Sequence, residues 1–145
     1  MAEALLTVRG AGRVVAGSAG SRPVARVNPL AVQALAEVGI PWEGRVPRGF
    51  EAVERQEWDV VLTVCDDARD ACPVFPAATV AAHWGLPDPA GAAGSEAARL
   101  AAFREARDVL AWRVDRFLDL DLAGMAPGDL ARALGEIGRS VPPVL

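Results

Sequence analysis

The two cysteines of the chain, Cys65 and Cys72, are separated by six residues, of which three are aspartates. Cys65 follows an apolar run over residues 60–64 that is preceded by Asp59, a pattern that predicts a buried strand. Cys65 therefore stands at the carboxyl end of a strand, where open α/β sheets keep their active sites. Because the intervening segment is polar, we expect a mobile loop there. A thiol pair in this setting indicates redox chemistry rather than packing.

If residues 65–72 were helical, a rise of about 1.5 Å per residue would place the two cysteines about 10 Å apart. A disulfide requires Cα atoms within about 7 Å of each other. The pair can thus close only if the segment loops or unwinds, which would couple oxidation to a local conformational change. One alternative stays open at this point, since burial as inert thiols is the commoner fate of cysteine. A zinc site is set aside, because zinc normally takes four ligands, which Cys65, Cys72 and the single His83 cannot supply. We expect no metal site.

Length and composition limit the class of protein. A chain of 145 residues suits one domain with one core, and although 52% of its residues are hydrophobic, no apolar run is long enough to span a membrane. The first ten residues lack the basic start of a signal peptide. A net charge of −4 without a basic block argues against a nucleic-acid partner. Two cysteines in a chain without an export signal indicate a reducing compartment, so we expect a cytoplasmic location.

Periodicity and helix caps predict an alternation of helices and strands. Asn28 and Pro29 form a helix start, with Asn28 as the N-cap and Pro29 at the first helical position. In chain order the predicted elements are a helix over 2–9, a short strand over 13–16, a helix over 29–39, strands over 58–64 and 78–84, and helices over 95–118 and 129–139. This order predicts an α/β fold with a parallel sheet flanked by helices on both faces.

Five segments of the chain resemble, in the same order, the thioredoxin-coupled arsenate reductases, which have the low-molecular-weight tyrosine phosphatase fold. The most specific are the Cys-x6-Cys-Pro motif and the run His-Trp-Gly-x-x-Asp-Pro-Ala. The segments are Arg26–Pro29, Thr63–Asp66, Cys72–Pro76, His83–Ala90 and Phe103–Asp108. The resemblance covers residues 1–118 as an arsenate reductase domain, and residues 119–145 are similar to a C-terminal helical extension of some bacterial members.

The resemblance implies a thiol relay for the reduction of arsenate to arsenite. In this family a first cysteine on a Cys-x5-Arg loop attacks arsenate, a second displaces arsenite by attacking the first, and a third attacks the second. Thioredoxin reduces the final disulfide. By position, Cys65 matches the second cysteine, Cys72 the third and Asp88 the general acid. On its own, Asp88 would be taken for a turn residue, but its setting between two prolines suits a rigidly positioned acid.

Other residues have supporting roles in the same comparison. Glu3 and Ser18 match positions that brace the Cys-x5-Arg loop in some members. His83 is expected to be a structural histidine, because no acid partner or nucleophile is evident from the sequence. The family implies arsenate as substrate, thioredoxin as reductant, no cofactor and a monomer.

The chain departs from the family pattern in one large respect. The first strand and the Cys-x5-Arg loop would lie before Met1, so the oxyanion-binding residues are expected upstream of Met1, and this chain alone is expected to be inactive. Either the chain start is an internal methionine of a longer protein, which we favour, or the chain is a truncated relative. The alternatives to arsenate reduction are a low-molecular-weight tyrosine phosphatase, disfavoured by the cysteine pair, and a non-catalytic family member.

Overall fold

The computed structural model describes residues 1–76 and 79–144 of the chain, and it contains five helices and two strands that position the candidate site. Two short 3-10 turns, Phe50–Ala52 and Pro89–Gly91, complete the regular structure of the described residues. The elements are α1 (Ala2–Gly10), α2 (Pro29–Ala36), β1 (Val60–Thr63), α3 (Asp66–Ala71), β2 (Val80–His83), α4 (Glu96–Leu118) and α5 (Pro127–Arg139). Within the described part of the chain, no helix is both long enough and apolar enough to cross a bilayer.

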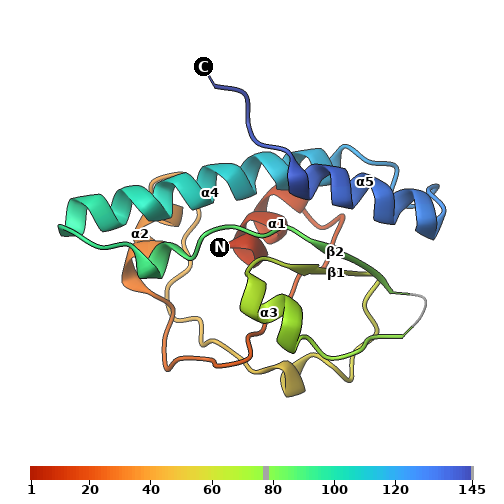
Figure 1. Ribbon diagram of the computed structural model, residues 1–145, viewed down its shortest axis with the longest axis horizontal. Coiled ribbons are helices and arrows are strands. Elements are labelled where there is room, and N and C mark those ends of the chain that lie inside the picture. The colour runs from red at the N-terminus through yellow and green to blue at the C-terminus, as the bar shows by residue number, and fades with distance from the viewer. Residues whose placement is uncertain (77–78, 145) are drawn as a thin grey trace.

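The strands β1 and β2 form a parallel sheet, which confirms the predicted α/β fold. Val60 is paired with Val80 and Thr63 with His83, so the two strands end at the same edge. Helix α5 packs against β2, and α3 lies beside β1. In Figure 1, α4 and α5 lie above the strands and α3 lies below them. The residues that follow the two strands, which include Cys65, therefore lie at the same end of the sheet.

The strand predicted over residues 13–16 is not formed. In the described residues the sheet has two strands, and the chain near Val15 makes no regular structure, with 88% of Val15 exposed. Its β-branched residues favour an extended backbone. A strand, however, also requires a neighbour for its backbone N–H and C=O groups. The nearest pairing downstream is an isolated bridge between Gly20 and Gly49.

The main hydrophobic core joins α1, α4 and α5 to the inner face of the sheet. Trp84, directly after β2, is fully buried, and its ring meets Phe117 of α4 edge-to-face at a centroid distance of 6.3 Å. The Trp84 indole N–H donates to the carbonyl of Leu134 in α5 at 2.9 Å. Leu130, Leu134 and Ile137 of α5 belong to this core, so residues 119–145 do not form a separate one. The division of the chain after residue 118 stays a prediction.

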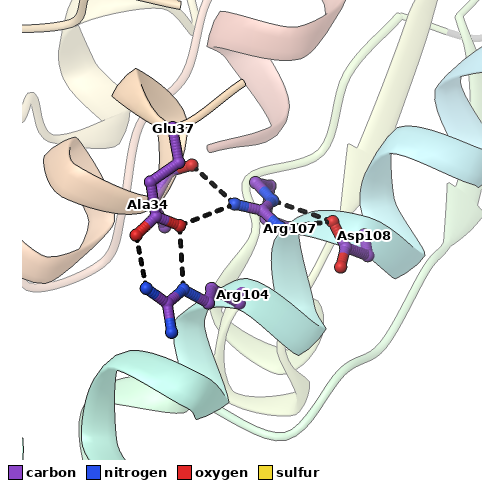
Figure 2. Close-up of polar contacts among 5 residues, drawn as sticks. All are labelled: Ala34, Glu37, Arg104, Arg107 and Asp108. Atoms are coloured by element: carbon purple, nitrogen blue, oxygen red, sulfur yellow. Dashed lines mark hydrogen bonds and ion pairs between the residues drawn. The ribbon is translucent and has the colours of Figure 1, made fainter. Parts of the chain in front are cut away.

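Ion pairs and hydrogen bonds join α2 to α4 (Figure 2). The carboxylate of Glu37 accepts two hydrogen bonds from Arg104, at 2.6 and 2.8 Å. The hydrogen bond from Arg104 is the main cause that lowers the pKa of Glu37, which keeps it ionised. Arg107 is buried, donates to the carbonyl of Ala34 at 2.8 Å and contacts Asp108. Since Ala34 lies in the last turn of α2, Arg107 satisfies a carbonyl that the helix leaves unpaired.

The close approach of α5 to the end of β2 gives a prediction about Gly138. A Cβ at this position would lie 2.4 Å from the carbonyl oxygen of His83 and 2.7 Å from Cδ1 of Trp84. Because the first contact is with backbone, Gly138→Ala should lower the free energy of unfolding by about 1–3 kcal/mol. The control is Gly128→Ala in the same helix, where a Cβ meets nothing within 4 Å. It should be neutral or stabilise by up to about 1 kcal/mol. Urea unfolding measures both, and equal effects would contradict the close packing.

Candidate active site

The segment between the two cysteines is helical, so the predicted loop is wrong. Helix α3 spans Asp66–Ala71, and the carbonyl of Cys65 accepts from the N–H of Arg69 at 3.1 Å. The charges at its two ends favour this helix. Its first residue is acidic and Arg69 lies in its last turn, so each charge complements the helix dipole at its own end. The geometric condition still holds: at about 1.5 Å per residue, a helix keeps Cys65 and Cys72 about 10 Å apart. A disulfide between them requires α3 to unwind.

Both cysteines are half-buried thiols, and Cys72 lines a cavity of about 380 Å³. The cavity is lined by residues of both strands and by the segment that follows α3. Burial raises the pKa of the Cys72 thiol, since the thiolate would lose water contacts. The lining residues include Val61, Thr63, Cys72, Phe75, Ala81 and His83. The partly apolar surroundings of Cys72 therefore disfavour its thiolate form.

His83 has an acid partner that was not evident from the sequence. Its Nε2 lies 2.9 Å from Oδ1 of Asp66, and its Nδ1 lies 2.7 Å from Oγ1 of Thr63. With Nε2 protonated to donate to Asp66, a neutral His83 ring accepts from the Thr63 hydroxyl at Nδ1. Gly85 leaves space for the ring, because a Cβ there would lie 2.5 Å from Nε2. The contact between His83 and Thr63 follows from the parallel register, which pairs these two residues at the ends of neighbouring strands.

Arg113 of α4 is a second residue that the sequence did not reveal. It is 4% exposed, and it donates to the carbonyls of Trp84 at 2.9 Å and Ser140 at 3.3 Å. No carboxylate pairs with it among the contacts of the described residues, its Nε has no partner there, and burial lowers its pKa. Arg113 thereby ties the backbone after β2, which leads to Asp88, to the C-terminal segment.

Asp88 lies on an exposed turn between two prolines. Its Oδ1 accepts from the N–H of Ala90 at 2.9 Å and caps the 3-10 turn Pro89–Gly91. Its backbone is extended, with φ −68° and ψ 113°, as expected for a residue that precedes proline. Asp88 is not among the residues that line the cavity around Cys72. The structure thus shows a turn-capping aspartate with a constrained backbone, and its role as an acid stays a prediction.

Glu3 and Ser18 are brought together, at a distance from the thiol pair in the sequence. The Ser18 hydroxyl donates to the Glu3 carboxylate, which links α1 to the chain that follows it. In the described residues, no group of three or more His, Cys, Asp or Glu side chains could hold a metal ion. Bracing of an anion-binding loop by Glu3 and Ser18 stays a prediction.

Comparison with known proteins identifies the family. The family model described as "Low molecular weight phosphotyrosine protein phosphatase" matches residues 1–125, and the chain belongs to this family. Proteins named arsenate reductase from Halalkalibacterium halodurans and Bacillus subtilis are each 37% identical over 93 residues, which is 64% of this chain and 67% of each relative. A solved structure of an arsenate reductase in the reduced state superposes with a TM-score of 0.60 at 29% identity, covering 81% of this chain and 84% of that one.

Proposed function

We propose that the chain is the thiol-relay part of an arsenate reductase. The observation that carries the proposal is the pair of half-buried thiols on either side of α3, at the carboxyl edge of the parallel sheet. The relatives named arsenate reductase support the substrate. A phosphatase reaction offers no use for the cysteine pair, since hydrolysis of a phosphate ester moves no electrons between thiols.

The proposed relay has three thiol steps. A first thiolate bonds to arsenic and releases water from arsenate. Cys65, as a thiolate, then attacks that sulfur and forms a disulfide, while the electron pair of the broken S–As bond leaves with arsenic, which is thereby reduced from As(V) to As(III) and released as arsenite. Cys72 attacks Cys65, which frees the first thiol and leaves a Cys65–Cys72 disulfide for thioredoxin to reduce. Because the chain has two cysteines, the first thiol must come from outside these 145 residues, and the chain alone is inactive in this proposal.

The helix and the cavity suit Cys72 for the last attack. While Cys72 lies in the cavity its pKa is raised, so little thiolate is present to attack prematurely. Unwinding of α3 brings Cys72 toward Cys65 and out of its apolar cover, which favours the thiolate when it is required. Asp88 would protonate the oxygen that leaves arsenate, and Glu3 with Ser18 would brace the anion loop. We propose a monomer with no resident cofactor or metal.

The thiol pair can be tested in this chain directly. Oxidised glutathione should convert Cys65 and Cys72 to an intramolecular disulfide, and reduced thioredoxin should restore both thiols. Because closure unwinds α3, amide exchange over residues 66–71 should accelerate about tenfold or more in the oxidised form, as for a segment that has lost its helical hydrogen bonds. Thiol titration and exchange mass spectrometry measure the two effects.

The matched control for this experiment is Cys72→Ser, which leaves Cys65 but removes the pair. It should form a mixed disulfide with glutathione while α3 stays protected. Folded protein whose two thiols stay unreactive would contradict the redox role of this segment.

A further inference from the structure

The bond between His83 and Asp66 connects the sheet to the helix that separates the two thiols. Asp66 is the first residue of α3 and directly follows Cys65. His83 is the last residue of β2, and its cross-strand neighbour Thr63 is the last residue of β1. Contacts of 2.7 Å from Nδ1 to Thr63 and 2.9 Å from Nε2 to Asp66 fix the ring from both sides. The imidazole therefore joins a rigid sheet edge to the start of α3.

Helix α3 depends on such a tether. It has six residues, fewer than the roughly 12 that an isolated helix requires for stability in water. Asp66, Arg69, Asp70 and Ala71 are all exposed, so these residues contribute little buried apolar surface. The side chain of Asp66, the first residue of α3, links this helix to the sheet through His83.

We infer that His83 is a positioning residue of the relay: through Asp66 it holds α3 helical, keeps Cys65 and Cys72 apart, and so sets how readily their disulfide forms. This inference rests on the proposed function. The bond belongs to the reduced state, because closure unwinds the helix that aims Asp66 at the ring. Loss of the bond therefore destabilises the dithiol relative to the disulfide, so the equilibrium constant for disulfide formation rises and the reduction potential becomes more negative.

The expected change in the equilibrium constant for disulfide formation is limited by the solvent exposure of the two side chains. The His83 side chain is 23% exposed and that of Asp66 is 90% exposed, so solvent screens their attraction. We expect loss of the bond to raise the equilibrium constant about three- to fivefold, which is about 14 to 21 mV for a two-electron couple at 29.6 mV per tenfold.

The experiment equilibrates the protein with reduced and oxidised glutathione and measures the Cys65–Cys72 disulfide by thiol trapping. In this reaction two protein thiols become one disulfide while one oxidised glutathione becomes two reduced molecules. The variants are Asp66→Ala, His83→Phe and the double variant. Asp66→Asn is the matched control, because its amide oxygen can still accept from Nε2–H. Each variant is also unfolded in urea with both cysteines changed to serine, which separates global stability from the thiol equilibrium.

The inference requires that each single variant raise the equilibrium constant about three- to fivefold, that the double variant add nothing further, and that Asp66→Asn stay near the wild-type value. Additive effects of the two single variants, or an unchanged equilibrium constant, would overturn it. Asp66 is exposed, so Asp66→Ala decides the question even where His83→Phe fails to fold. If the wild-type protein forms no intramolecular disulfide at all, the proposed function itself fails, which is a different outcome from a disulfide that is indifferent to His83.

Discussion

Addition of an apolar strand followed by a Cys-x5-Arg loop to the N-terminus of the chain is expected to produce a protein that reduces arsenate with thioredoxin, whereas we propose that the chain alone does not. The 145 residues supply two thiols, and the proposed relay uses three. The added loop provides the thiolate that bonds to arsenic, and its arginine balances the oxyanion charge. Helix α1 would follow this loop and offer its N-terminal amides to the oxyanion. Arsenite formation with thioredoxin, thioredoxin reductase and NADPH measures the gain.

The first control is the unextended chain, for which turnover should not exceed the background without protein. The second is an extended protein whose loop cysteine is serine, which should fold equally well and stay inactive. Turnover by the unextended chain would show that one of its own thiols attacks arsenate, and would contradict the proposed order of the relay.

Within the extended protein, Cys72→Ser should stop the reaction after one cycle. The first two attacks do not involve Cys72, so about one arsenite per protein should appear in a burst. Without Cys72, the Cys65–Cys72 disulfide cannot form, and the nucleophile stays trapped in a disulfide with Cys65. A quenched-flow measurement of arsenite per protein distinguishes this from slow turnover. Many cycles by Cys72→Ser would show that Cys72 is not the last thiol.

The same extension should raise stability. In the described residues β1 pairs with β2 alone, and all four residues of β1 are half-buried. A further strand along the open edge of β1 would pair backbone groups and cover apolar side chains. Because an unpaired buried backbone group costs about 1–3 kcal/mol, we expect a gain of at least about 2 kcal/mol in the free energy of unfolding.

Helices with local start signals were predictable from the sequence. Asn28 accepts from the N–H of Leu30 at 2.9 Å, and Ser95 accepts from the N–H of Ala98 at 3.1 Å, as N-caps do. These signals lie within a few residues of the element that they start. The apolar run that forms β1 was equally clear, since it ends where the polar residues begin.

The errors arose where structure depends on distant partners. Val15 has a strand-forming side chain, but a strand also requires a neighbour, and the described residues provide none for it. Asp66 looked like a loop residue because the segment after Cys65 is polar, yet the charges of α3 suit its ends and His83 holds its first turn. Arg113 gave no signal, because its acceptors are backbone carbonyls that only the folded chain brings together.

In the extended protein, Asp88→Asn should slow the first step about 100-fold or more, the usual contribution of a positioned general acid. The substitution removes the acidic proton but keeps the cap of the turn, because the amide oxygen of asparagine can still accept from the N–H of Ala90. The yield of arsenite in a single turnover should reach the normal value, only more slowly, and both thiols should titrate normally. Rapid-quench kinetics with limiting protein gives the rate constant of this step.

Asp121→Asn is the matched control for this experiment. Asp121 caps a turn in the same way, accepting from the N–H of Gly124 at 3.1 Å, but it lies far along the chain from the proposed acid. Its substitution should leave the rate unchanged and alter stability as little as Asp88→Asn does. If Asp88→Asn matched this control in rate, Asp88 would be a turn residue and the proton for the leaving oxygen would come from elsewhere. A slow rate with an intact turn, by contrast, assigns the loss to the carboxylic acid itself, because asparagine retains the shape and the cap but has no acidic proton to transfer.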